Sequence, residues 1–289
     1  MIPPAFEYLR PNTLPEAIAL LQQYGDDAKI LSGGQSLIPM MKFRLARPSH
    51  LIDINRISGL SYIKEEGGYL KIGGLVREAE LEDSPLIRQK YPILFDTSRV
   101  IADPQVRNMA TLAGNLAHGD PANDHPATMM ALGAEIVAVG PQGERVIPVA
   151  NFFITLFTTD LRHGEIVTEI RIPTPPPRSG GAYLKLERKV GDFATAAVAA
   201  QVTVDQEGNC QKAGIALTNV GAIPIKVANA EEFLRGRKLN ETNITLAAQM
   251  AAEAAQPSSD LRGPEEYKRG LVKELTRRAL GRAYERASK

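Results

Sequence analysis

The sequence has 289 residues, which is enough to bury a substantial core without metal or disulfide cross-links. Its 34 basic and 33 acidic residues leave a net charge of +1, so the charge gives no indication of a nucleic-acid or acidic membrane surface. The single cysteine, Cys210, excludes an internal disulfide and cannot supply the four thiolates that an iron–sulfur cluster normally requires.

The beginning of the chain is expected to form a mixed sheet with one helix. Thr13 is the predicted N-cap of that helix, with Glu16 three residues later, and Gly25 ends it. A Gly67-Gly68 pair predicts the turn of a hairpin. The expected helix is 13–24, and the expected strands are 6–8, 28–31, 50–54, 62–64 and 69–72.

The middle of the chain is expected to contain short helices, a long polar loop and a strand pair. Prolines at positions 85 and 92 divide the helical pattern. The expected elements are helices within 78–100, a loop over 103–126, a helix at 127–132, and strands at 135–139 and 145–148.

Repeated prolines within 173–177 predict a domain boundary, because proline continues neither a helix nor a strand ladder. Three antiparallel strands and then three helices are expected beyond it, which is an α+β arrangement. The strands are 182–188, 195–204 and 211–218, and the helices are 225–234, 244–255 and 265–286.

The first residues, MIPPAFEYLRPN, lack the basic start and the apolar run of a secretory signal. No segment approaches the roughly 18 uninterrupted apolar residues of a membrane span. A cytoplasmic protein is therefore expected, with loose association with the inner membrane face left open.

The first motif that carries chemistry is the string ILSGGQSL at residues 30–37, where a strand runs into two glycines and a helical turn. Adjacent glycines let backbone N–H groups point into one concavity and let a phosphate approach closely. The start of a helix adds partial positive charge. A tight structural turn would explain the same residues equally well.

The second motif is RNMATLAGNL at residues 107–116, followed by GDPAND at 119–124. Its small residues offer backbone donors, and Asp124 offers an acceptor suited to ribose hydroxyls. The alternative is a structural loop with Asx turns. A polar loop of about 20 residues inside a compact domain is usually functional, however, so the two motifs together predict a clasp around a diphosphate.

The strings AKILSGGQSLIPMMKFRLARP (28–48) and ADPQVRNMATLAGNLAHGDPANDHPA (102–127) resemble the two FAD loops of the flavin-binding medium subunits of molybdenum hydroxylases, the xanthine dehydrogenase family. Within it, DPQVRN and GDPANDHPA are most similar to carbon monoxide dehydrogenase medium chains. The resemblance continues through 165–173 and YLKLERKVGDFATAA (183–197), so it spans nearly the whole chain.

The resemblance implies an α+β fold with FAD as the cofactor. A two-subdomain FAD-binding domain of the PCMH (vanillyl-alcohol oxidase-like) type would occupy 1–57 and 58–175. An α+β domain of the carbon monoxide dehydrogenase flavoprotein C-terminal type, with an antiparallel sheet and helices, would occupy 176–289.

The family's cofactor-binding residues can be carried over position by position. The first loop matches at Ile30, Leu31, Ser32, Gly33, Gly34, Gln35, Ser36 and Leu37, and the second at Thr111, Leu112, Ala113, Gly114 and Asn115. Other matches are apolar positions that line the cofactor, a ribose or adenosine contact, a nearby lysine and an aromatic residue: Ile101, Val167, Asp124, Lys185 and Phe193.

Two of these positions depart from the family's pattern. Ala113 stands where a second glycine is common, so the closest backbone approach there carries one methyl group more. Phe193 stands where relatives often have tyrosine over the isoalloxazine ring, so its ring can stack or shield but donates no hydrogen bond.

Other candidate residues are weaker, and neither a catalytic residue nor a metal site is assigned. Cys210 is expected to be a small buried hydrophobic residue rather than a redox centre. Arg188 and Lys189 either face the diphosphate or extend into solvent. The histidines are too scattered for a metal site and are expected in solvated or capping roles: His50, His118, His125 and His163.

The resemblance implies an electron-transfer role within a larger oxidoreductase. Electrons would come from a molybdenum centre through two-iron, two-sulfur clusters and leave the flavin for an external acceptor. This chain lacks the cysteines for those clusters and the length for a molybdopterin domain. A large molybdopterin subunit and a small iron–sulfur subunit are therefore expected partners, in a dimer of heterotrimers.

Two alternatives stay open at this point. The chain could be a stand-alone FAD oxidase that acts directly on an organic substrate, or a non-catalytic nucleotide-binding module. The substrate of a complete enzyme is undetermined, because the family serves purines, aldehydes and other heterocycles.

Overall fold

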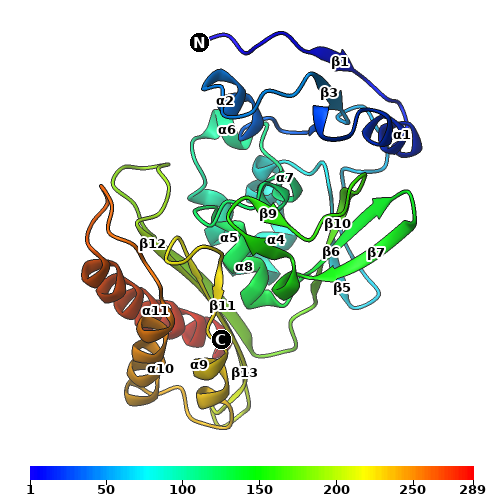
Figure 1. Ribbon diagram of the computed structural model, residues 1–289. Coiled ribbons are helices and arrows are strands. Elements are labelled where there is room, and N and C mark those ends of the chain that lie inside the picture. The colour runs from blue at the N-terminus through cyan, green and yellow to red at the C-terminus, as the bar shows by residue number, and fades with distance from the viewer.

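The computed structural model describes all residues from 1 to 289 and arranges them in three blocks along the chain (Figure 1). The N-terminal block is a three-stranded parallel sheet in the order β1-β3-β2. Its elements are β1 (Glu7–Leu9), α1 (Leu14–Tyr24), η1 (Gly25–Asp27), β2 (Ala28–Leu31), α2 (Leu37–Lys42) and β3 (His50–Asp53).

Helix α1 begins and ends where the sequence predicts. The Glu16 backbone N–H donates to Thr13 Oγ1 at 3.3 Å, and the Asn12 N–H donates to Glu16 Oε2 at 2.8 Å. These bonds satisfy N–H groups that the first helical turn leaves without partners. Gly25, at φ 57°, ends the helix in a backbone conformation that favours glycine.

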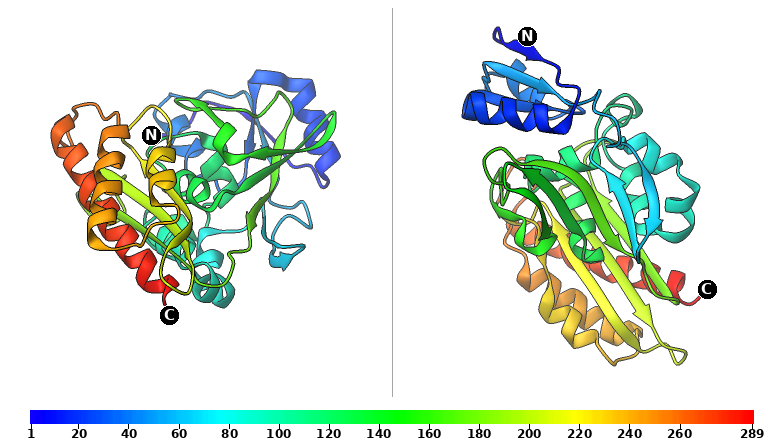
Figure 2. Two further views of the ribbon diagram at one scale, coloured as in Figure 1. Left: turned by 90° about the horizontal axis from the view of Figure 1, so that it is seen from below. Right: turned by 90° about the vertical axis from the view of Figure 1, so that its right-hand side faces the viewer.

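The expected single mixed sheet is wrong, because the N-terminal strands and the hairpin belong to different sheets. The hairpin forms as β4 (Ile63–Glu66) and β5 (Tyr69–Gly73), within a five-stranded antiparallel sheet of order β4-β5-β10-β6-β7. The outer edge of β5 pairs with β10 (Ile166–Pro173), which is almost entirely buried. β5 is therefore paired on both sides, with β4 and with β10. Figure 2 shows the N-terminal block set apart from this sheet.

The middle block packs helices against this sheet around a core that includes Tyr91, Leu94 and Phe152. Its helices are α3 (Glu78–Asp83), α4 (Pro85–Lys90), α5 (Pro92–Arg99), α6 (Pro104–Arg107), α7 (Leu112–His118) and α8 (His125–Leu132). Its remaining elements are β6 (Glu135–Gly140), β7 (Gly143–Pro148), η2 (Val149–Asn151), β8 (Phe153–Thr155) and β9 (Thr158–Thr159).

The expected continuous loop over 103–126 is also wrong, because it contains α6 and α7. The Val106 N–H donates to Asp103 Oδ1 at 2.9 Å at the start of α6. The Gly114 N–H donates to Thr111 Oγ1 at 3.0 Å at the start of α7. Both helices are too short to show a clear apolar period, so only these capping residues could have predicted them.

The C-terminal block is a four-stranded antiparallel sheet covered on both faces. Its elements are β11 (Ser179–Leu186), β12 (Ala196–Val204), β13 (Cys210–Thr218), β14 (Ile225–Lys226), α9 (Ala228–Leu234), α10 (Glu241–Ala254) and α11 (Glu265–Ala287). The expected helix at 225–234 begins later than predicted, because Ile225 and Lys226 pair with β13.

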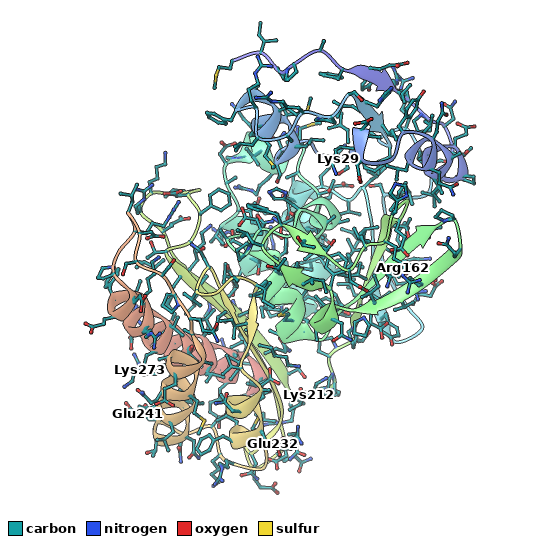
Figure 3. The ribbon with its side chains drawn as sticks, in the orientation of Figure 1. Lys29, Arg162, Lys212, Glu232, Glu241 and Lys273 are labelled. Atoms are coloured by element: carbon teal, nitrogen blue, oxygen red, sulfur yellow. The ribbon has the colours of Figure 1, made fainter.

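Helices α9 and α11 pack on one face of this sheet and α10 packs on both of them, while α5 and α8 of the middle block cover the other face (Figure 2). Charged side chains such as Glu241 and Lys273 lie on the outer side of the C-terminal helices (Figure 3). None of the helices combines the length and the apolar character needed to cross a bilayer. The C-terminal sheet is thus joined to the middle block through a shared buried layer.

Candidate cofactor site

A cleft of about 700 Å³ opens where the three blocks meet. Every residue assigned from the sequence lines it except Leu31 and Leu112. Leu112 is fully buried in the middle block's core, and the Leu31 side chain lies beside Gly34. The two loops, the apolar positions, the lysine and the aromatic residue are therefore brought together in one place.

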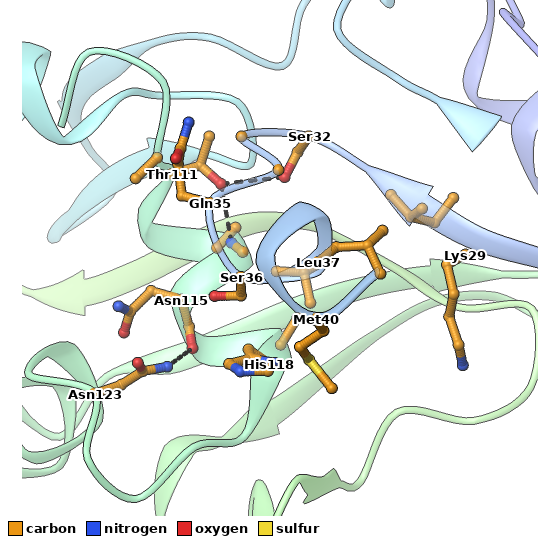
Figure 4. A pocket seen from close by; sticks show the side chains of 18 of the residues that line it. Lys29, Ser32, Gln35, Ser36, Leu37, Met40, Thr111, Asn115, His118 and Asn123 are labelled. Atoms are coloured by element: carbon orange, nitrogen blue, oxygen red, sulfur yellow. Dashed lines mark hydrogen bonds between the residues drawn. The ribbon is translucent and has the colours of Figure 1, made fainter. Parts of the chain in front are cut away.

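The two glycine-containing loops touch each other at the edge of the cleft. The hydroxyls of Ser32 and Thr111 lie 3.3 Å apart, within hydrogen-bonding distance (Figure 4). A Cβ at Gly33 would lie 2.5 Å from the Met109 carbonyl oxygen and 2.8 Å from Ala110 Cα. Gly33 is thus needed for the close approach of the two loops to each other, in addition to any approach of a phosphate. The sequence alone did not reveal this contact.

Side chains outside both loops hold this contact in place. Asn55, just after β3, donates from Nδ2 to the Ser32 carbonyl at 2.9 Å. Arg77 donates from Nη2 to Asn55 Oδ1 at 2.6 Å and from Nη1 to the Met109 carbonyl at 2.5 Å. The guanidinium therefore ties the first loop to the second through one planar donor set.

The paired loops present backbone donors without internal partners. No backbone hydrogen bond is donated by the N–H groups of residues 33–36 or of Leu112 and Ala113. Asn115 Oδ1 is buried and has no hydrogen-bond partner, while the backbone carbonyl of Asn115 accepts from Asn123 Nδ2 at 2.7 Å (Figure 4). These N–H groups and the Asn115 amide oxygen are therefore available to bind a ligand in the cleft.

The wall contributed by β11 is polar and almost fully buried. Lys185 donates from Nζ to Asp124 Oδ2 at 2.9 Å and to the Val100 carbonyl at 3.0 Å. The Tyr183 hydroxyl donates to Asp124 Oδ1 at 2.6 Å. Both Asp124 oxygens thus already accept bonds from the protein, so its side chain holds Lys185 in addition to any contact with a ribose.

Phe193 lies on the loop between β11 and β12, at the mouth of the cleft and half exposed. Asp192 holds this loop through Arg188 and Arg262, each at 3.1 Å. A Cβ at Gly191 would lie 2.6 Å from the Ala102 carbonyl, so the loop folds tightly onto the middle block. Arg188 is exposed, as one of the two expectations had it, and its guanidinium pairs with Asp192.

Of the histidines, His163 is exposed as expected, whereas His125 is not. His118 and His163 line the cleft, and burial lowers the pKa of His118. His125 is fully buried, with Nε2 2.7 Å from Glu78 Oε2, which corrects the expectation of a solvated or capping role. The i, i+3 spacing of Asn115 and His118 on one helix face was the available signal, but α7 itself had not been predicted.

Further lining residues were missed because they come from segments that the motifs do not include. Lys29 on β2 and Met40 on α2 belong to the N-terminal block, and Lys29 lies on the side that faces the middle block (Figure 3). Phe157 comes from the turn between β8 and β9, where its ring lies 5.2 Å from that of His118. Only the tertiary fold places these segments beside the glycine loops.

Residues 4–175 match the family described as "FAD binding domain in molybdopterin dehydrogenase", and residues 181–283 match the "CO dehydrogenase flavoprotein C-terminal domain". The chain is 44% identical to the carbon monoxide dehydrogenase medium chain of Hydrogenophaga pseudoflava, over 100% of both chains. It is 38% identical to the 6-hydroxypseudooxynicotine dehydrogenase complex subunit alpha of Paenarthrobacter nicotinovorans, over 99% of this chain and 97% of that one.

Solved structures agree with these matches. A chain of the carbon monoxide dehydrogenase from Hydrogenophaga pseudoflava superposes with a TM-score of 0.96, at 44% identity and 99% coverage of both chains. A chain of quinoline 2-oxidoreductase from Pseudomonas putida 86 gives 0.93, at 33% identity and 100% coverage of both. The chain belongs to the family of FAD-binding medium subunits of molybdenum hydroxylases.

The geometry of the cleft fits FAD. Its volume of about 700 Å³ lies within the range of cofactor sites. Two groups of unpaired N–H donors meet in it, as a diphosphate requires. A Cβ at Gly114 would lie 2.7 Å from Thr111 Oγ1 and 3.2 Å from Ser32 Oγ, so glycine keeps the junction of the loops open. Membership of the family thus confirms FAD, the cofactor expected from the sequence, and the residues of the cleft fit it.

Proposed function

We propose that this chain holds FAD in the cleft between its three blocks and passes electrons from a partner iron–sulfur subunit to an external acceptor. The observation that carries the proposal is the pair of contacting loops, 32–36 and 111–115, with their unpaired backbone donors. FAD supplies the redox chemistry, and the protein supplies position, shielding and electrostatics.

Each wall of the cleft has a separate task in this proposal. The N–H groups of residues 33–36, together with those of Leu112 and Ala113, bind the diphosphate. Ile101 and Val167 exclude water from the flavin, and Phe193 shields its ring at the mouth of the cleft. Lys185 brings a buried positive charge to the same cavity.

The relatives are subunits of multi-subunit enzymes, and we infer the same for this chain. A large molybdopterin subunit and a small iron–sulfur subunit would complete a heterotrimer, with two heterotrimers in the assembly. The domain limits at 57 and 175 and the cytoplasmic location stay predictions from the sequence. The similarity to carbon monoxide dehydrogenase medium chains makes carbon monoxide the first substrate to test with the complete enzyme.

Reconstitution of the purified chain with FAD tests the site. A visible flavin band is expected to remain after gel filtration with FAD but not with riboflavin, which lacks the diphosphate. In Gly114→Val, added atoms fill the junction of the loops, so the band is expected to be lost. Gly281→Ala is the control, because nothing lies within 4 Å of its added Cβ.

Three results would contradict parts of this proposal. Absence of a flavin band in the unsubstituted chain would refute FAD binding by the isolated subunit. Retention of the band in Gly114→Val would refute the role of the loops. Bleaching of the band by a small organic substrate without any partner would instead favour a stand-alone oxidase.

A further inference from the structure

A buried polar cluster, called the seam below, joins the C-terminal sheet to the cofactor cleft and consists of Tyr183, Thr218, Asp124 and Lys185. The Tyr183 hydroxyl lies 2.6 Å from Asp124 Oδ1 and 3.3 Å from Thr218 Oγ1. Asp124 Oδ2 in turn lies 2.9 Å from Lys185 Nζ. Tyr183 is 3% exposed and the Lys185 side chain 2%, so the seam is closed to bulk water.

The Lys185 ammonium has partners besides Asp124. Besides Asp124, it donates to the Val100 carbonyl at 3.0 Å and lies 3.3 Å from Glu187 Oε2. Two hydrogen bonds and the charge of the Glu187 carboxylate, whose Oε2 accepts no hydrogen bond, therefore set its position. Because Lys185 and Asp124 both line the cleft, they contribute to the charge presented there.

We propose that Tyr183 is a positioning residue for the cofactor site, holding the Asp124 carboxylate that holds the Lys185 ammonium, so that the C-terminal sheet tunes the redox potential of bound FAD. The inference rests on the proposed function. Tyr183 itself does not line the cleft, and it acts through Asp124.

The charge balance of the seam gives the direction of the effect. Burial raises the pKa of Asp124, while the Lys185 charge and the Tyr183 hydrogen bond oppose that rise. Glu187 lies on the same wall, and His125 Nε2 is paired with Glu78. The cleft is also lined by other charged or titratable groups, which are unchanged in the variants: Asp26, Lys29, His118, His163, Glu165 and Asp192. Removing the Tyr183 hydroxyl removes one of the opposing interactions, so Asp124 takes up a proton at a higher pH.

Protonation of Asp124 leaves the Lys185 charge less compensated. A more positive environment favours the reduced flavin, which carries more negative charge than the oxidised flavin, so the midpoint potential rises. This difference must vanish at low pH, where Asp124 is protonated in both proteins, and at high pH, where it is ionised in both. A purely structural role for Tyr183 would produce no such dependence on pH.

The test is a series of midpoint potentials of FAD in the assembled enzyme between about pH 5 and 9. The midpoint potential of the Tyr183→Phe enzyme is expected to exceed that of the unsubstituted enzyme between the two pKa values of Asp124 and to converge with it at lower and at higher pH. The Asp124→Asn enzyme is expected to have a higher midpoint potential than the unsubstituted enzyme wherever Asp124 is ionised. The Lys185→Met enzyme is expected to have a lower midpoint potential.

Tyr91→Phe provides a matched control. Tyr91 is equally buried and donates to Glu65 Oε1 at 2.9 Å, but it is remote from the cleft lining. The midpoint potential of FAD in the Tyr91→Phe enzyme is expected to equal that in the unsubstituted enzyme. A Tyr183→Phe profile that coincides with the unsubstituted profile at every pH overturns the positioning role while leaving the proposed function intact. Failure of the unsubstituted enzyme to retain FAD overturns both.

Discussion

At the scale of single residues, Gly33 and its neighbours show how one missing side chain shapes a site. The sequence suggests glycine for close approach to a phosphate, whereas the structure places Gly33 against the Met109 carbonyl and Ala110 Cα. The residue type was predicted correctly and the reason for it was incomplete. A contact between positions 33 and 109 is set by the tertiary fold, so no local pattern could have shown it.

Gly33→Ala is expected to weaken FAD binding by roughly tenfold or more, since the loops must separate to relieve contacts below 3.0 Å. Flavin fluorescence titration measures the dissociation constant. Gly270→Ala is the control, because its Cβ meets nothing within 4 Å inside α11, and helix propensity alone should stabilise it by about 0.5–1 kcal/mol. Equal FAD affinity in Gly33→Ala and the unsubstituted protein would contradict the role assigned to Gly33.

His118 provides a prediction for the dependence of stability on pH. Burial lowers its pKa, so the folded chain binds this proton less readily than the unfolded chain. Its contribution to the free energy of unfolding is therefore present above about pH 6.5 and is lost as the pH falls towards the lowered pKa. Urea denaturation measures the free energy of unfolding at pH 8 and at pH 5. Its decrease from pH 8 to pH 5 should be larger for the unsubstituted protein than for His118→Gln. Equal losses would show that this histidine is not the group responsible.

At the scale of elements, the long and well-capped segments were predictable and the short ones were not. Helix α1 has a local cap and an apolar stripe, so its limits could be read from residues 13–25. The helices α6 and α7 have one or two turns, and their caps at Asp103 and Thr111 looked like ordinary loop residues. The separate sheets depend on β10, whose pairing partners lie about 30 to 100 residues away.

The junction between α5 and α11 leads to a prediction at this scale. Asp96 on α5 accepts from Arg286 Nη1 at 2.6 Å and Nη2 at 3.1 Å, and its side chain is 9% exposed. Asp96→Asn removes the charge and leaves the guanidinium without its carboxylate. Chemical denaturation is expected to show a loss of roughly 1–3 kcal/mol in the free energy of unfolding.

Glu274→Gln is the matched control on the same helix. Glu274 pairs with Arg277 and Arg278 on the exposed side of α11, where ion pairs contribute little. Its free energy of unfolding should stay close to that of the unsubstituted protein. If Asp96→Asn were equally neutral, the junction of the C-terminal sheet with the middle block would depend on apolar packing alone.

At the scale of the whole molecule, the cleft connects blocks that each have their own core. Its lining combines the N-terminal loop, α7 and the wall of β11, so a cofactor that fills the cleft would contact all three blocks. The C-terminal sheet is also packed between α11 on one face and α5 and α8 on the other. FAD binding should therefore stabilise parts of the chain that it does not touch.

Cys210 reports this coupling because it is fully buried in the C-terminal core, away from the cleft lining. Burial raises the pKa of its thiol to about 11, so it should react with a disulfide reagent only when the sheet opens. FAD at about 100 times its dissociation constant should add about 2.7 kcal/mol to the free energy of unfolding. Where opening of the sheet requires global unfolding, the thiol should then react about 100-fold more slowly.

The experiment follows thiol reaction in moderate urea with and without FAD, and the reaction of a free thiol under the same conditions corrects for direct effects of the additives. An unchanged rate, measured while the thermal midpoint of the whole chain rises, would show that the C-terminal sheet opens independently of the cofactor site. Slowed reaction in the unsubstituted chain but not in Gly114→Val, which is expected to lose FAD, would show that the slowing depends on FAD held by the two loops. In that case the loops would connect the cofactor to a strand about 100 residues further along the chain, through the buried layer that α8 and β13 share.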